Sequence, residues 1–224
     1  MEKAYYEAYD DRYCQVHEQG LQWTSNAHTE IVETILVDYP VPASAKILEI
    51  GCGEGRDAVH MLEKGYNLLA TDVSPEAIRY CREAAPKWAD RFSVLDCLRD
   101  EREEQFDFIY AVAVLHMLVR DADRSGFYRF FAKHLTEQGI GLVCSMGDGS
   151  FEICSDIAQA FVPQRRTHGE SGREMMIAGT SCRVVTWEQF LREPEENGLQ
   201  VIRHGITAVE PDFPEMMYAV VRKI

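Results

Sequence analysis

The stretch that decides the fold is residues 46–72, KILEIGCGEGRDAVHMLEKGYNLLATD. It begins with the apolar run ILEI, of the kind that a buried parallel strand shows. A turn with glycine at alternate positions, 51–55, follows at once, and glycine tolerates the positive φ angles that such a turn needs. We predict a helix over 56–64 and a second strand over 66–71, with Asp72 at its end. Ligands of open α/β sheets bind at the carboxyl edge of the strands, so the turn and Asp72 are candidate binding groups.

The spacing of the glycines separates two families of nucleotide-binding fold. A dinucleotide-binding fold favours G-x-G-x-x-G, whose third glycine would fall on Arg56. The chain instead has G-x-G-x-G preceded by an acid, Glu49, and EIGCGEG resembles the first motif of the class I S-adenosylmethionine-dependent methyltransferases. A nicotinamide-dependent oxidoreductase, and a turn that only links a strand to a helix, remain as alternatives.

The resemblance implies a cofactor, S-adenosylmethionine (SAM), with S-adenosylhomocysteine as product, and a place for each part of it. The turn would hold the methionine part, and Asp72 would accept hydrogen bonds from the ribose hydroxyls. The residues after Asp72 would border the adenine, Asp96 would accept from its exocyclic amine, and the apolar end of the fourth strand would pass beneath the methyl donor. For Asp96 a simple helix-cap or turn aspartate is the alternative. The implied cofactor-binding residues are Glu49, Gly51, Cys52, Gly53, Arg56, Asp57, Asp72, Val73, Ser74, Asp96, Cys97, Ala111 and Val112.

Helix and strand signals alternate through most of the chain. Gly65, Gly139 and Gly198 each stand between a helical pattern and a strand pattern, which is the rhythm of a doubly wound parallel sheet. We therefore expect an α/β, Rossmann-like, seven-stranded and mostly parallel sheet with N-terminal helices, closed by an antiparallel hairpin of the last two strands. The further elements that we expect are helices over 75–85, 121–135, 151–161 and 186–197 and strands over 92–95, 106–111, 140–145, 199–209 and 216–221.

The first residues, 1–44, read as a helical lid on this sheet. Four tyrosines recur there at helical spacing, namely Tyr5, Tyr6, Tyr9 and Tyr13. We assign Tyr13 to the cofactor, because a sulfonium near an aromatic face gains cation–π attraction, and Trp23 to the acceptor side of the same lid. The alternative is an aromatic stripe that only packs on the core. A second helix is expected over 25–38, with Ser25 as its N-cap.

Residues 147–185 interrupt the alternation after the fifth strand, and we predict a substrate cap there, since so long a connection in a compact domain usually has a function. Arg165, Arg166, His168 and Arg173 reverse the local charge of the chain within this cap. We assign Arg165 and Arg166 to a small, anionic acceptor, because arginine pairs carboxylates and phosphates in two-point geometry. A solvated loop, or arginines paired with acids elsewhere on the chain, is the alternative.

His116, after the fourth strand, is the candidate catalytic residue, because histidine can act as a general base near neutral pH. A packed or positioning histidine is the alternative. We expect no metal site, since no His or Cys cluster has ligand spacing.

The composition sets further limits on the chain of 224 residues, which suits a single domain over 1–224. The net charge of -14 disfavours binding to nucleic acid, and no apolar run reaches membrane-spanning length. The N-terminus does not resemble a signal peptide, and seven scattered cysteines indicate free thiols in a cytoplasmic protein. We expect a monomer or a homodimer.

The resulting hypothesis is a methyltransferase that passes the SAM methyl group to a small-molecule acceptor by in-line displacement. Alignment and exclusion of water can carry such a reaction without a triad or a metal, since orientation alone supplies about 7–11 kcal/mol. The alternatives are a SAM-binding sensor without catalysis and a metalloid or thiol methyltransferase, which Cys52, Cys97 and Cys144 near the strand ends suggest.

Overall fold

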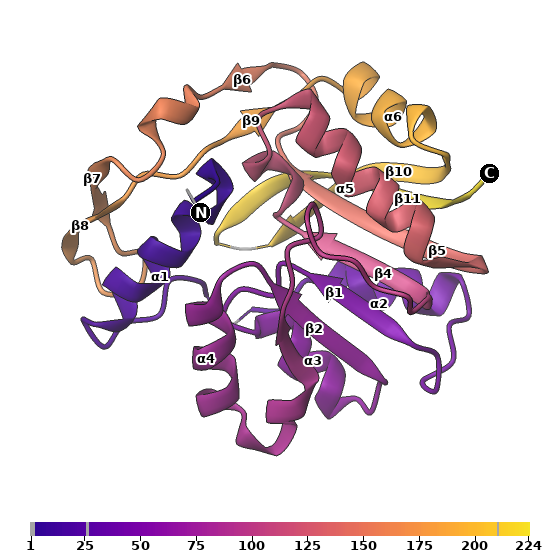
Figure 1. The fold of residues 1–224 in the computed structure, drawn as a ribbon, viewed down its shortest axis with the longest axis horizontal. Coiled ribbons are helices and arrows are strands. Elements are labelled where there is room, and N and C mark those ends of the chain that lie inside the picture. The colour runs from indigo at the N-terminus through magenta and orange to yellow at the C-terminus, as the bar shows by residue number, and fades with distance from the viewer. Residues whose placement is uncertain (1–2, 26, 210) are drawn as a thin grey trace.

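A seven-stranded sheet forms the centre of the molecule, in the order β10-β11-β5-β4-β1-β2-β3 (Figure 1). The computed structural model describes residues 3–25, 27–209 and 211–224. The strands of the sheet are β1 (Ile47–Ile50), β2 (Leu68–Asp72), β3 (Phe92–Val94), β4 (Phe106–Val112), β5 (Leu135–Met146), β10 (Leu199–Val209) and β11 (Phe213–Lys223). The pairs among β1 to β5 are parallel, and β11 pairs antiparallel with both β5 and β10. The predicted Rossmann-like sheet and its closing hairpin are confirmed.

Helices cover both faces of the sheet, because the central strands are apolar on both sides. In β4, Phe108 and Tyr110 belong to one buried cluster with Ile35, while Ile109 belongs to another with Phe127. Successive strand residues point to opposite faces, so this alternation requires a helical layer on each. The helices are α1 (Ala8–His17), α2 (Glu30–Asp38), α3 (Arg56–Glu63), α4 (Pro75–Ala84), α5 (Asp121–His134) and α6 (Trp187–Glu196), with short 3-10 turns η1 (Tyr5–Glu7), η2 (Pro86–Arg91), η3 (Leu115–Met117) and η4 (Ile157–Gln159).

Three of the expected elements differ in the structure. Helix α2 begins at Glu30 with Thr29 as N-cap, while Ser25 donates its hydroxyl hydrogen bond to Asp212 instead (2.8 Å). Strand β5 starts directly after α5, so Gly139 lies within the strand and does not end the helix. The expected helix over 151–161 is absent; that stretch holds the short strand β6 and the single turn η4.

Residues 147–185, the predicted substrate cap, form two small antiparallel strand pairs. Strand β6 (Ile153–Cys154) pairs with β9 (Arg183–Val184), and β7 (Pro163–Thr167) pairs with β8 (Glu174–Ala178). Helix α1 lies beside the β7–β8 hairpin, far from it in sequence (Figure 1), and Val16 packs against Met175 and Ile177. We call residues 5–24 together with β7 and β8 the covering layer. Its functions as lid and cap remain predictions.

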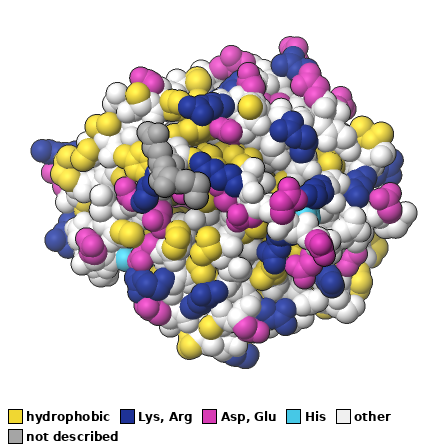
Figure 2. Space-filling view, viewed as in Figure 1, with side chains coloured by type: hydrophobic (Ala, Val, Ile, Leu, Met, Phe, Trp, Pro, Cys, Tyr) yellow, Lys and Arg dark blue, Asp and Glu magenta, His cyan; other side chains and the backbone are white. Residues whose placement is uncertain are grey.

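The surface mixes charges of both signs. Figure 2 shows basic and acidic side chains interspersed over one face, without a continuous basic stripe. Among the described residues, no helix combines the length and the apolar character that crossing a bilayer requires.

Candidate cofactor and acceptor site

The glycine turn after β1 is enclosed on two sides. Gly51 and Gly53 have φ angles of 74° and 53°, in the left-handed region that favours glycine. A Cβ on Gly51 would lie 2.3 Å from Cγ2 of Val114, and a Cβ on Gly53 would lie 2.8 Å from the Tyr13 hydroxyl. The turn therefore has glycine both for its backbone angles and for the close approach of β4's exit and of α1.

Asp72 ends β2 directly beside this turn. Its two carboxylate oxygens accept hydrogen bonds from the backbone N–H groups of Gly53 and Ser74, each at 2.8 Å. Burial raises the pKa of Asp72 to about 6, and the backbone donors only partly oppose this. The carboxylate keeps free lone pairs, so it can still accept from a ligand hydroxyl.

Glu49, which precedes the turn, is a buried acid with an unused oxygen. Its side chain is 3% exposed, and Oε2 has no hydrogen-bond partner among the described residues. Burial, and then the neighbouring Asp57 charge, raise the pKa of Glu49 well above its usual range. An unpaired buried carboxyl is unfavourable, and a cationic group placed at the turn would satisfy it.

The first residues of α3 face the N-terminal helices. Both oxygens of Asp57 accept from Thr29, one from its backbone N–H (2.7 Å) and one from its hydroxyl (2.8 Å). Arg56 donates to Asp212 at 3.3 Å and to the Thr29 hydroxyl at 3.4 Å. The structure thus engages both side chains in holding the start of α2.

Asp96, the predicted adenine acceptor, is bonded to the covering layer. The Tyr6 hydroxyl donates to Oδ2 (2.9 Å), and the Leu98 backbone N–H donates to Oδ1 (2.9 Å). Cys97 beside it is half-buried. An adenine amine would therefore share this carboxylate with Tyr6 or replace its hydroxyl.

Helix α1 is held against the start of α4, where the predicted residues Val73 and Ser74 lie. Ser74 caps α4 by accepting from the Ala77 N–H (3.0 Å), as expected for a serine before a proline. The Ser74 hydroxyl in turn donates to Asp10 of α1 (2.7 Å), whose same oxygen accepts from the Glu76 N–H (3.1 Å). One acid of α1 thus reaches the edge of the site, and Val73 lies half-buried next to it.

Glu54 and His17, two residues that the sequence analysis missed, fasten the covering layer to the glycine turn. Glu54 accepts from His17 Nε2 (2.8 Å), from the Trp23 N–H (2.7 Å) and from the N–H and hydroxyl of Thr24 (2.7 Å each). His17 Nδ1 faces Glu76 at 2.6 Å. Burial lowers the pKa of His17, but the two carboxylates outweigh it and raise the pKa overall. The signal in the sequence was Glu54 itself, because an acid inside the glycine turn has no role in the backbone geometry of that turn.

The end of β4 is buried and strained. Ala111 and Val112 are buried, and Ala113 follows with a φ of 57°, in the left-handed region that a residue with a Cβ rarely adopts. Strain of this kind costs about 1–3 kcal/mol and concentrates at functional sites. The bend directs Val114 onto Gly51, which brings β4's exit against the turn.

His116 lies in η3 just beyond this bend. It is 3% exposed, its ring lies 5.7 Å from that of Phe213, and its Nδ1 has no hydrogen-bond partner within the described chain. Burial, and then the charge of Arg124, lower the pKa of His116 to about 4. The imidazole is therefore neutral at pH 7 and a weak base, which favours positioning or packing over proton transfer.

Arg165 and Arg166 occupy opposite faces of the β7–β8 hairpin. Arg165 lies on the outer face and pairs with Glu174 at 3.5 Å. Arg166 stands opposite Met175, whose side chain is buried toward α1, and its guanidinium donates to Gln164 (3.1 Å). Both arginines are exposed, so the structure does not bring them together as one two-armed clamp.

Arg12 of α1 is a buried cation that the sequence analysis missed. It is 4% exposed, donates to the Ala178 carbonyl through Nε (3.1 Å) and Nη2 (2.9 Å), and lies over the rings of Tyr9 and Trp23 at 5.0 and 4.8 Å. Within the described residues it has no carboxylate partner. Burial lowers the pKa of its guanidinium, and the like charge of Arg166 lowers it further. A buried cation without a counter-ion is a candidate group for an anionic ligand.

Comparison with known proteins agrees with this geometry. Residues 48–140 match the family model of a methyltransferase domain. The chain is 32% identical over 104 residues to Hemagglutinin 1 of Eikenella corrodens, covering 44% of this chain and 31% of that protein. It is 26% identical over 102 residues to a probable S-adenosyl-L-methionine-dependent methyltransferase, TehB, of Haemophilus influenzae, covering 44% and 34%. The chain thus spans about a third of the length of these relatives.

A solved structure extends the similarity over the whole fold. The 1,6-didemethyltoxoflavin-N1-methyltransferase of Burkholderia thailandensis superposes with a TM-score of 0.70 at 16% identity, covering 100% of this chain and 91% of that one. Residues 48–140 are a methyltransferase domain, and the fold is that of the class I S-adenosylmethionine-dependent methyltransferases. The family predicted from the glycine turn is confirmed and is favoured over a nicotinamide-dependent oxidoreductase.

The three cysteines near the strand ends, Cys52, Cys97 and Cys144, do not form a reactive thiol site. The Cys81 thiol and burial raise the pKa of Cys52, and burial raises the pKa of Cys97 and of Cys144. A thiolate is the nucleophilic and metal-binding form, so these three thiols are inert at neutral pH. The arrangement gives the thiol or metalloid alternative no support.

Proposed function

We propose that the chain binds SAM at the glycine turn and transfers its methyl group to a small-molecule acceptor by in-line displacement. The observation that carries the proposal is the combination of a turn that only glycine fits with two acids that keep unused acceptor capacity, Asp72 and Glu49. SAM presents a matching set of groups, since its ribose hydroxyls can donate to Asp72 and its ammonium can satisfy Glu49. When bound, it supplies a methyl group on an electrophilic sulfonium.

The protein's own part is to position the acceptor and to exclude water. Tyr13 is 5% exposed and touches the turn, and Tyr6 reaches Asp96, so the covering layer can enclose both ends of the cofactor. The bend at Ala113 and the buried end of β4 would form the floor beneath the reacting centre. His116, neutral at pH 7, serves in this proposal to support that floor.

For the acceptor, the covering layer offers a cation. Arg12 lies between the aromatic faces of Tyr9 and Trp23 with Arg166 near enough to oppose its charge, so an anionic group beside them would relieve two unpaired cations. The similar B. thailandensis enzyme holds a small molecule, 1,6-didemethyltoxoflavin, together with S-adenosylhomocysteine. We propose a small anionic acceptor here, bound by Arg12 and Arg166, in a reducing, cytoplasmic compartment that suits seven free cysteines.

Calorimetry with SAM and S-adenosylhomocysteine tests the cofactor site. Asp72→Asn should weaken binding roughly tenfold or more, because a charge-assisted hydrogen bond contributes about 1.5–3 kcal/mol. Asp90→Asn is the matched control, since the Asp90 side chain is 83% exposed. Equal SAM affinity in the two variants would show that the ribose is held elsewhere.

Turnover separates an enzyme from a sensor that binds SAM without catalysis. Formation of S-adenosylhomocysteine is followed with a panel of small carboxylates, phosphates and neutral metabolites. Once an acceptor is found, Arg166→Gln should raise its KM without changing SAM affinity, and Arg165→Gln, on the opposite face, should change neither. SAM binding without turnover of any compound would favour the sensor.

A further inference from the structure

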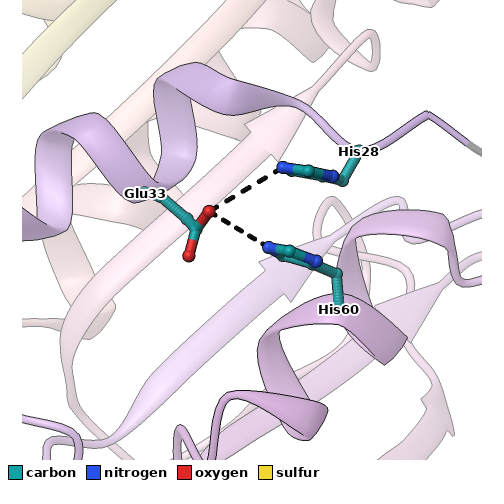
Figure 3. Close-up of side chains that lie close together, drawn as sticks. All are labelled: His28, Glu33 and His60. Atoms are coloured by element: carbon teal, nitrogen blue, oxygen red, sulfur yellow. Dashed lines mark ion pairs between the residues drawn. The ribbon is translucent and has the colours of Figure 1, made fainter.

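Three side chains of metal-binding types, two from residues 28–33 and one from α3, converge on one another. His28 precedes α2, Glu33 lies on α2 and His60 lies on α3, and both imidazoles face the same carboxylate (Figure 3). The His60 Nε2 lies 3.1 Å from Glu33 Oε2, and the His28 Nε2 lies 3.7 Å from that same oxygen. All three ligand atoms lie within 4.8 Å of one another, and all three side chains are half-buried.

These contacts are not ordinary hydrogen bonds. His60 Nε2 is buried and has no hydrogen-bond partner among the described residues, although the carboxylate oxygen is only 3.1 Å away. The His28 Nε2 is too far from that oxygen for a hydrogen bond. The two rings stack with centroids 3.7 Å apart and an interplanar angle of 8°, and both imidazoles face the Glu33 carboxylate. A buried nitrogen such as His60 Nε2 is rarely left without a partner.

The spacing fits a common ion. Ligands at about 2.0–2.2 Å from a tetrahedral Zn²⁺ lie about 3.3–3.5 Å from one another. The two nitrogen–oxygen separations, 3.1 and 3.7 Å, lie on either side of this range, and the two stacked rings would have to splay apart for both nitrogens to direct their lone pairs at one ion. A cavity of ≈ 340 Å³ lined by His28 and His60 leaves room for a water as fourth ligand.

We propose that His28, Glu33 and His60 form a zinc site of two imidazoles and one carboxylate with a water in the fourth position. Binding would tie the segment before α2 to α3. The same segment contains Thr29, which Asp57 holds, and α3 begins directly after the glycine turn. The ion would therefore stiffen the support beneath the turn without touching the reacting centre.

Lys64 opposes the ion. Its ammonium lies 2.9 Å from the other oxygen of Glu33. The carboxylate therefore already has a cation beside it, which repels a second one. Removing that charge should strengthen metal binding, an effect that a packing role of the three side chains would not produce.

Zinc titration of the chelator-treated protein of residues 1–224 by calorimetry tests the site. One Zn²⁺ should bind per chain, His60→Ala and His28→Ala should each weaken binding at least tenfold, and Lys64→Met should tighten it. Glu30→Gln, which removes a charge from the same helix outside the cluster, should leave it unchanged. Circular dichroism of each variant verifies folding.

Cobalt distinguishes this site from the thiols. Co²⁺ should give the intense visible bands of a tetrahedral complex without a thiolate charge-transfer band, in wild type and in Cys154→Ser alike. A thiolate band that disappears in Cys154→Ser would assign the ion to the cysteines. The proposal is also overturned by wild type that binds no zinc, or by His60→Ala and Lys64→Met affinities equal to wild type.

Discussion

The interactions that stabilise the central sheet differ in kind from those that attach the covering layer to it. In the sheet, side chains such as Phe108 and Ile109 are fully buried on opposite faces, and burying each contributes about 1.5–3 kcal/mol. The covering layer adds polar contacts, such as Asp10 with Ser74 and His17 with Glu54, to the packing of Tyr5, Tyr6 and Ala8 against the core. A neutral hydrogen bond contributes about 0.5–1.5 kcal/mol, somewhat more when charged. The sheet should therefore set global stability, while the layer can open without unfolding it.

The largest effect is expected inside the body of the fold, at Arg124. Its guanidinium is 1% exposed, pairs with both oxygens of Glu193 at 2.7 Å, and also donates to the carbonyls of Leu115 and Leu118. Arg124→Met leaves a buried carboxylate unpaired and should lower the free energy of unfolding by about 3–5 kcal/mol. Arg192→Met, at an exposed ion pair on α6, should change it by less than about 1 kcal/mol. Urea denaturation measures both, and similar small losses would mean that the buried pair is not essential.

The next effect is at the turn itself, where Gly51 and Gly65 form a matched pair. Both have positive φ, 74° and 85°, but a Cβ on Gly51 would collide with Val114, whereas nothing lies within 4 Å of one on Gly65. Gly65→Ala should cost about 1–2 kcal/mol from backbone strain alone. Gly51→Ala should cost about 1–3 kcal/mol more, from the overlap. Equal losses in urea midpoint would show that Val114 moves aside freely.

Titration of Asp72 should make both the stability of the fold and the affinity for SAM depend on pH. Its native pKa of about 6 lies above the ordinary 3.8, so its contribution to stability is present at low pH and is lost as the pH rises through 6. Ligand binding has the opposite sign, because the ionised carboxylate accepts from hydroxyls. SAM affinity should fall up to tenfold per unit below about pH 6, or about 1.4 kcal/mol. Calorimetry should show a flatter profile in Asp72→Asn, and the same slope there would assign the titration to another group.

The smallest effect separates the covering layer from the sheet. Asp10 accepts hydrogen bonds from Ser74, the N-cap of α4, and from Glu76 in its first turn, whereas Asp11 accepts from Lys3. Asp10→Ala should raise amide exchange in α1 and weaken SAM binding several-fold, a local loss of about 1 kcal/mol, with the urea midpoint nearly unchanged. Asp11→Ala should do neither. A lowered urea midpoint in Asp10→Ala would mean that layer and sheet unfold together.

Sequence alone was sufficient for the sheet, the glycine turn and the family. Those features depend on signals within a few residues, namely alternating apolar positions, glycines that permit positive φ, and an acid at a strand end. Ser74 before Pro75 was likewise a sufficient signal for the start of α4, because a helix cap is a local bond.

Tertiary structure decided every feature whose partner lies far along the chain. Helix α2 starts at Glu30 because Asp57, 28 residues after Thr29, holds its N-cap. Arg12 is buried and Arg165 is exposed, because the burial of Arg12 depends on which face of α1 meets β8. His28, Glu33 and His60 have no ligand spacing in sequence and meet only because α2 and α3 pack side by side. The sequence by itself determined the fold and the place of the glycine turn. The long-range packing of polar side chains, which no local pattern records, decided which groups surround that turn.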